Sequence, residues 1–253
     1  MSINWNETPA AIWRQLKGSL RAVRTIDPIR LDQLLGIDDQ KHTLVRNTEK
    51  FIAGLPANNV LLWGSRGTGK SSLIKGLLNE YFDQGLRIVE VDKDDLVYLP
   101  EIVDEIRDQP QRFIVYCDDL SFEAGEKTYK ALKSVLEGSI ESPPDNVLIY
   151  ATSNRRHLMP EYMSENLTSQ VVETEIHHGE AIEEKISLSD RFGLWISFYP
   201  FNQDRYLEII DHYFKSFSGD RNELHRKAIQ FALQRGGRSG RAAYQFYKNS
   251  VEK

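Results

Sequence analysis

Eight consecutive residues near position 70 have the residue types and spacing of a phosphate-binding loop. Glycines let such a loop curl without a Cβ clash, so that its backbone N–H groups can converge on a phosphate. The lysine near its end can bridge the outer phosphates of a nucleotide, and the hydroxyl that follows suits a magnesium ligand. The run therefore predicts a site for a phosphate group and a magnesium ion. Its residues are Gly64, Ser65, Arg66, Gly67, Thr68, Gly69, Lys70 and Ser71, with Ser72 next.

A loop of this kind needs a strand before it and a helix after it, because its N–H groups and the helix N-terminus must point at one phosphate. Residues 59–63 form an apolar, strand-like run, and residues 72–78 carry apolar side chains at helical spacing. The alternative is a glycine-rich turn that only caps a helix. The flanking pattern favours the phosphate site over that alternative.

An acidic pair, Asp118 and Asp119, ends the run of residues 112–119, whose continuous hydrophobicity is typical of a central strand in a parallel sheet. Acids also follow strands in ordinary turns, but Asp118 stands 48 residues after the loop lysine, which leaves room for a helix, a strand and another helix. Asp118 can then reach the magnesium ion through water while Ser71 binds it directly. Asp119 is the candidate for polarising an attacking water, and Glu123 competes with it for that role.

Asn154 lies just beyond another predicted strand, residues 146–151. A side-chain amide fixed at this position can hold a nucleophilic water against the terminal phosphate with little reorganisation. A plain turn asparagine is the alternative interpretation. The phosphate loop upstream favours the catalytic one.

Apolar spacing predicts the remaining elements. Residues 8–24 place apolar side chains on one face and basic ones on the other, which predicts an amphipathic helix packed on the core; a partner-binding or nucleic-acid-binding arm is the alternative. After residue 200 helical spacing recurs without a strand-like run, which predicts a small all-helical C-terminal unit. The expected strands are residues 59–63, 86–91, 112–119, 146–151 and 194–198, and the expected helices include 39–53, 100–108, 125–138, 203–217, 220–234 and 239–250.

Composition places the chain among ordinary globular proteins. Of its 253 residues 27% are charged and 40% hydrophobic, and the net charge of −5 argues against a surface that binds nucleic acid throughout. The single cysteine, Cys117, lies in an apolar run and is expected to be a small buried side chain in a reducing compartment. No signal peptide opens the sequence and no apolar run reaches membrane-spanning length, so a cytoplasmic location without a membrane partner is expected.

Taken in order, these residues resemble an AAA+ ATPase from about Leu35 to the end of the sequence. The resemblance identifies residues 64–71 as the Walker A motif, residues 113–119 as Walker B and Asn154 as sensor 1. No single one of the later motifs is specific. Their order along the chain carries the resemblance.

Three further residues take roles from the same resemblance. Arg191 falls in a segment similar to the arginine-finger box, and Arg241 resembles sensor 2, with Arg238 as the alternative. Ile37 ends a short stretch that resembles the one packed on the adenine ring in that superfamily. These residues are therefore expected at an ATP site or at its contact with a neighbouring subunit.

More narrowly, residues 117–123, 151–158 and 184–193 resemble a bacterial family of AAA+ proteins known mainly as a domain of unknown function. The piece at residues 190–193 is also similar to replication initiators and helicase loaders. Asp119 departs from the general pattern, in which a glutamate stands. The departure bears on the rate of hydrolysis rather than on nucleotide binding.

The resemblance implies a three-layer α/β P-loop core with a five-stranded parallel sheet, followed by a small helical lid. The expected divisions are an N-terminal helical segment (1–34), an AAA+ core (35–200) and the lid (201–253). ATP, bound with Mg²⁺ at the junction of core and lid, would be hydrolysed to drive a conformational change in a partner or an oligomer. Arg191 would act from a neighbouring subunit, which implies a homo-oligomer.

Three alternatives stay open. A nucleotide-gated binding module with little hydrolysis is supported by Asp119 in place of glutamate. A small-molecule kinase also uses a P-loop and a lid, although Asn154 and the Arg191 segment disfavour it. A DNA-associated role depends on Arg155, Arg156 and the basic N-terminal segment. The sequence discloses neither a protein client nor a pathway.

Overall fold

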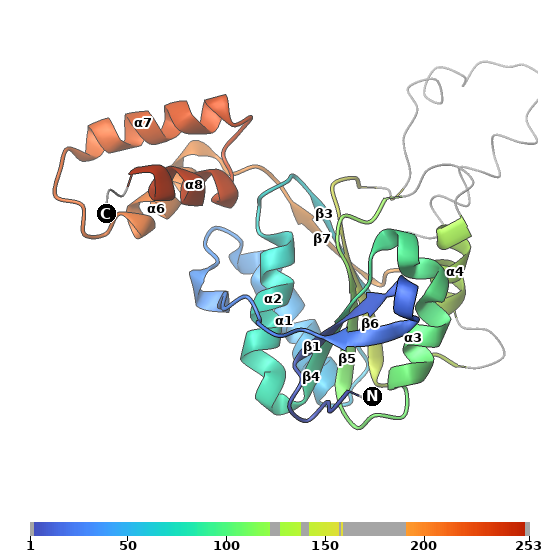
Figure 1. Cartoon of the computed structure of the whole chain (residues 1–253). Helices are drawn as coiled ribbons and strands as arrows, with labels where there is room; N and C mark the ends of the chain where they lie inside the picture. Colours follow the sequence, from blue (N-terminus) through green and yellow to red (C-terminus); the bar gives the residue numbers. More distant parts are fainter. Residues whose placement is uncertain (1–2, 122–126, 138–141, 157, 159–190, 251–253) are drawn as a thin grey trace, which may run out of the picture.

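The computed structural model of the chain describes residues 3–121, 127–137, 142–156, 158 and 191–250 (Figure 1). A mixed sheet runs through its centre in the order β2-β1-β4-β5-β6-β3-β7. All five predicted strands are present and pair in parallel with one another. They are β3 (Val60–Gly64), β4 (Leu86–Glu90), β5 (Arg112–Cys117), β6 (Val147–Ser153) and β7 (Leu194–Phe198).

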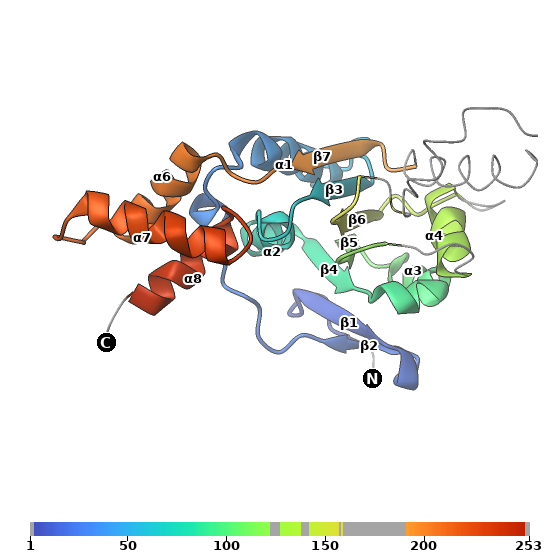
Figure 2. The same cartoon turned by 90° about the horizontal axis from the view of Figure 1, so that it is seen from above.

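Helices cover both faces of the sheet and make three layers. Figure 2 shows α1 (Asp38–Ile52) and α2 (Lys70–Tyr81) on one side of the strands, with α3 (Leu99–Ile106) and α4 (Lys127–Glu137) on the other. Side chains alternate across a strand, so successive residues of β3 pack on opposite faces of the sheet. Val60 and Leu62 are fully buried in the core under α1 and α2, and Leu61 is fully buried in the core under α3. The continuous hydrophobicity of these strands follows from burial on both faces.

The C-terminal helices form a separate small layer beside α1 and α2, as both views show (Figures 1 and 2). Asn202 and Asp220 cap α6 (Gln203–Tyr213) and α7 (Arg221–Gln234), since each side chain accepts a hydrogen bond from a first-turn N–H. The third helix is α8 (Gly240–Ser250). The three helices expected between residues 203 and 250 are therefore present, and we call them the lid.

The prediction of a helix over residues 8–24 was wrong. The segment forms a hairpin of β1 (Ala10–Arg14) and β2 (Ser19–Ala22), joined by a short 3-10 turn, and β1 pairs in parallel with β4. Ala11 and Trp13 point to one face and are buried there, a period of two that a helical pattern also accommodates in so short a segment. Pairing with the exposed edge of β4 outweighs local helix propensity, and the sheet has seven strands where five were expected.

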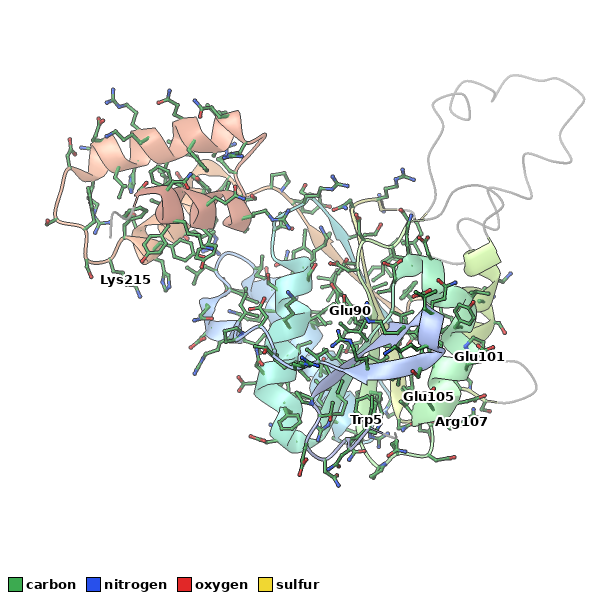
Figure 3. The ribbon with its side chains drawn as sticks, viewed as in Figure 1. Trp5, Glu90, Glu101, Glu105, Arg107 and Lys215 are labelled. Atoms are coloured by element: carbon green, nitrogen blue, oxygen red, sulfur yellow. The ribbon has the colours of Figure 1, made fainter. Side chains whose placement is uncertain are left out.

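Trp5 and Cys117 are also buried in the core. Trp5 lies at the bottom of the sheet, its ring edge-on to Phe113 with centroids 4.9 Å apart (Figure 3). Cys117 is 1% exposed, which confirms its expected burial. None of the helices in the described part of the chain combines the length and apolar character that a membrane crossing needs.

Candidate functional site

The loop between β3 and α2 has the backbone of an anion-binding turn. Gly64, Gly67 and Gly69 have φ values of 124°, 74° and 107°, which only glycine adopts readily. The Ser65 N–H donates to the carbonyl of Phe198 at the end of β7, which ties the start of the loop to the neighbouring strand. The loop ends at the N-terminus of α2, where free N–H groups favour an anion.

The Gly64→Ala protein should lose far more stability than a glycine replacement elsewhere. A Cβ at Gly64 would lie 2.0 Å from the carbonyl oxygen of Phe198, whereas a Cβ at Gly85, also at positive φ, meets no described atom within 4 Å. We expect Gly85→Ala to cost about 1–2 kcal/mol from backbone strain alone, and Gly64→Ala at least about 2 kcal/mol more. Urea unfolding of the two proteins measures the difference; equal losses would contradict the tight β3–β7 contact.

Lys70 is folded onto the loop that precedes it. Its ammonium donates to the carbonyls of Gly64 (2.7 Å) and Ser65 (2.8 Å) and lies 3.4 Å from Oδ1 of Asn154. Burial lowers the pKa of the Lys70 ammonium below its usual value, against the opposing charges of the two nearby carboxylates. The side chain therefore stands at the loop with hydrogen bonds to neutral oxygens, ready to exchange them for a phosphate.

Ser71 and Asp118 form the pair of oxygen ligands expected for magnesium. The Ser71 hydroxyl donates to Oδ1 of Asp118 at 2.8 Å, and the Thr152 hydroxyl donates to the same oxygen. Burial raises the pKa of Asp118, but the nearby hydroxyls of Thr152, Tyr116 and Ser71 outweigh it and leave the pKa below its ordinary value. The carboxylate is thus charged at neutral pH, and a hydroxyl with a carboxylate fits a magnesium ion that takes its other ligands from water and phosphate.

Asp119 adopts an uncommon backbone conformation, with φ 52°. Its N–H donates to the Thr152 hydroxyl at 2.9 Å, the Asn154 amide donates to its Oδ1, and Arg66 lies 3.8 Å from its Oδ2. Asp tolerates the left-handed region better than most residues, and such outliers cluster at functional sites. The turn holds the Asp119 carboxylate toward the phosphate loop.

The lid reaches the loop through the first turn of α8. The Arg241 N–H donates to the carbonyl of Gly67 at 3.2 Å, and the side chain of Ser239 caps the helix by accepting from the Ala242 N–H at 3.1 Å. The guanidinium of Arg241 is close enough to Lys70 to lower the lysine pKa, after the larger effect of burial. Of the two arginines considered as sensor 2, Arg241 lines the cavity at the loop, and the carbonyl of Arg238 instead accepts from the N–H of Phe201.

One cavity of about 870 Å³ joins these groups, a size in the usual range for nucleotide-sized ligands. It runs from the phosphate loop to a pocket between the lid and the segment that leads into α1. The predicted residues that line it are Arg66, Gly67, Thr68, Gly69, Lys70, Ser71, Ser72, Asp118, Asp119, Asn154, Ile37 and Arg241. Gly64 and Ser65 contribute the carbonyls that hold Lys70.

The cavity has further lining residues that were not predicted. Ile37, which was predicted, is buried beside the loop, with its Cδ1 3.2 Å from where a Cβ on Gly69 would stand. Thr152, directly before the Ser153-Asn154 tip, was detectable as a hydroxyl at a strand end. The others come from the segment before α1 and from residues 201–244, which lie far apart in the sequence. Leu35, in the predicted stretch that ends at Ile37, also lines the cavity. The additional lining residues are Asp27, Pro28, Ile29, Gln33, Leu34, Thr152, Phe201, Ile209, His212, Tyr213, Gly240 and Tyr244.

Among the described residues, one predicted catalytic residue, Arg191, is not brought to this cavity. Arg191 is exposed in the turn before β7 and does not line it. The opposite end of β7 meets the loop, where Phe198 pairs with Gly64, and the strand alone is about 16 Å long. Glu123 lies outside the described residues.

The sheet, loop and lid together define the fold of AAA+ ATPases. A point mutant of Thermotoga maritima RuvB matches with 15% identity, TM-score 0.55 and coverage of 87% of this chain and 64% of that one. A second point mutant of the same protein matches with 16% identity and TM-score 0.52, and the match covers 88% of this chain and 65% of that one. A chain of the E. coli MS115-1 HORMA:CdnC:Trip13 complex matches with 12% identity and TM-score 0.53, and the match covers 88% of this chain and 91% of that one.

These identities show a shared fold alone, and this chain spans less than two thirds of those two RuvB chains. A comparison with curated proteins finds no match. The family model "Protein of unknown function (DUF815)" matches residues 6–253, and the chain belongs to that family.

Proposed function

We propose that this chain is a Mg²⁺-dependent ATPase that couples ATP binding and hydrolysis to a conformational change in a partner or an oligomer. The observation that carries the proposal is the convergence of four separate segments on one cavity. The phosphate loop, the tips of β5 and β6, and the first turn of α8 all meet there. Such convergence is what an ATP site in an AAA+ fold requires, and the shared fold supports it.

Charge explains why the cavity suits a triphosphate. Lys70, Arg66 and Arg241 gather at the loop, and each of the two arginines lowers the pKa of Lys70, although less than burial does. A polyanion would relieve this repulsion and give the buried lysine a charged partner. The N-terminus of α2 opens directly from the loop, and its positive end favours the same charge.

The residues divide the work of hydrolysis. Lys70 and the loop N–H groups bind the phosphates, and Asp119 and Asn154 orient the attacking water. The water oxygen bonds to the terminal phosphorus, the bond between that phosphorus and the bridging oxygen breaks, and ADP and inorganic phosphate leave. Ser71 and Asp118 would hold Mg²⁺, which, when bound, neutralises charge on the phosphate oxygens.

The lid is the element through which nucleotide state would reach a partner. Among the described residues, the hydrogen bond from Arg241 to Gly67 joins α8 to the loop. A triphosphate that engages the Arg241 guanidinium would draw α8 toward the core, and ADP would release it. The differential contact of Arg241 with the terminal phosphate is the source of the motion in this proposal.

A second candidate function is a nucleotide-gated binding module with slow hydrolysis. Asp119 favours it, because the side chain is one methylene shorter than glutamate and is already engaged by Asn154 and Arg66. For a DNA partner, the supporting observation is the exposed Arg156, which lies over the ring of the partly buried Trp63, 5.6 Å from its centroid.

A phosphate-release assay separates these functions. We expect the wild-type protein to release phosphate from Mg·ATP, and Asp119→Asn to bind ATP normally while releasing phosphate about 100-fold more slowly. Asp104→Asn, on α3 between the labelled Glu101 and Glu105, is the matched control and should behave as wild type (Figure 3). Binding without release in the wild type would favour the gated module, and absence of binding would refute both functions.

A further inference from the structure

Tyr116 is a buried tyrosine directly beneath the predicted magnesium pair. It stands in β5 two residues before Asp118, which directly follows the strand, and both side chains lie on the side of α2. The residue is only 5% exposed and packs in the core cluster that holds the α2 helix. Its ring therefore occupies a position that phenylalanine would fill equally well.

The hydroxyl of Tyr116 sets it apart from other buried tyrosines. Among the described residues it makes no hydrogen bond of acceptable geometry. The hydroxyl of Tyr150 pairs with Asn47 at 3.0 Å, and that of Tyr206 donates to the carbonyl of Ala228 at 3.2 Å. Because a buried hydroxyl without a partner costs free energy, its presence in a folded protein calls for an explanation.

The groups around this hydroxyl supply an explanation for its presence. It is close enough to Ser71, Asp118 and Thr152 to interact with all three. Those are the groups that form the magnesium pair, and Ser71 and Thr152 already donate to one oxygen of Asp118. The unpaired hydroxyl thus lies beside the carboxylate on which the metal site depends.

We propose that Tyr116 is a positioning residue of the magnesium site, whose hydroxyl donates to the carboxylate of Asp118 when the metal is bound. The inference rests on the proposed ATPase function and assigns a role to the tyrosine inside the Walker B stretch, residues 113–119. Residues that hydrogen-bond a metal-binding carboxylate from behind orient it, and their loss usually weakens metal affinity. Ser71 must turn its oxygen to the metal, so an additional donor then keeps Asp118 in place.

This role makes a prediction that a purely structural role does not. In the ligand-free protein the hydroxyl is unpaired, so its removal should leave stability unchanged or higher. In the metal-loaded protein the same removal should weaken the site. Opposite effects in the two states are the signature of a residue retained for binding rather than for folding.

The test compares Tyr116→Phe with Tyr206→Phe, which removes a buried hydroxyl that has a partner. The measurements are the melting temperature in EDTA, the affinity for a fluorescent ATP analogue in EDTA, and the Mg²⁺ concentration that gives half of the Mg²⁺-dependent gain in affinity. For Tyr116→Phe we expect a melting temperature at or above wild type, unchanged affinity in EDTA, and a Mg²⁺ requirement about 10-fold higher. For Tyr206→Phe we expect a lower melting temperature and a normal Mg²⁺ requirement.

The other outcomes overturn the inference in distinguishable ways. A normal Mg²⁺ requirement in Tyr116→Phe, in a protein that binds the analogue, removes the role of Tyr116 and leaves the ATPase proposal intact. Loss of folding in EDTA shows that the hydroxyl serves the ligand-free structure, which contradicts the proposal. A wild-type protein that binds no analogue with or without Mg²⁺ refutes the proposed function, and the inference with it.

Discussion

Arg191→Ala should bind ATP as tightly as the wild-type protein and hydrolyse it at least about 1,000-fold more slowly, the effect of losing an arginine that neutralises the transition state. The position of Arg191 is the reason to expect that it acts in the site of a neighbouring copy. Arg191 is exposed at the end of β7 remote from the loop and does not line its own cavity. If it stabilises the terminal phosphate, it does so in the site of a neighbouring copy.

Mixing two inactive proteins tests that arrangement. Arg191→Ala retains an intact nucleotide site, and Lys70→Ala retains an intact Arg191. Mixed at equal amounts, they should recover turnover, because the second supplies the arginine that the first lacks. Turnover by the wild type should also rise more steeply than linearly with protein concentration. Normal turnover by Arg191→Ala, at any concentration, would contradict a role for this arginine in trans.

Lys70→Ala should weaken ATP binding by at least about thirtyfold, from the loss of roughly 2 kcal/mol when one partner of a buried charged hydrogen bond is removed. Without nucleotide, the change should be tolerated, because burial already lowers the pKa of Lys70 and its hydrogen bonds go to carbonyls of its own loop. Isothermal titration with Mg·ATP measures the first effect and thermal unfolding without ligand the second.

Lys75→Ala is the matched control for that experiment. Lys75 lies on the same helix, is about half exposed, and its ammonium pairs with Asp27 at 3.1 Å. Its loss should change ATP affinity by less than about threefold, as for other exposed ion pairs. Equal losses from Lys70→Ala and Lys75→Ala would mean that ATP binds through general positive charge rather than in the loop.

The sequence was informative wherever the determinant of structure is local. The glycine spacing around Lys70 fixes a loop conformation, and the continuous apolar run before Asp118 fixes a central strand. Because parallel strands end at one edge of the sheet, the tips at Asp118 and Asn154 could be placed beside the loop without knowing the rest. Arg241 follows from its place in the first turn of the last helix.

What the sequence missed depends on contacts distant along the chain. The hairpin at residues 10–22 is a hairpin because the edge of β4 pairs with it, and its own pattern suits a helix equally. His212, Tyr213 and Tyr244 line the cavity only because the lid docks beside Ile37. No pattern shows that the hydroxyl of Tyr116 lacks a partner while that of Tyr150 has one.

The most direct test of the account is a crystal structure of the wild-type protein with Mg²⁺ and a non-hydrolysable ATP analogue. We expect residues 64–71 to enclose the triphosphate, the metal to lie between Ser71 and Asp118, and the Arg241 guanidinium to face the phosphates. An analogue bound elsewhere, or Asp118 and Arg241 both directed away from the phosphates, would contradict it.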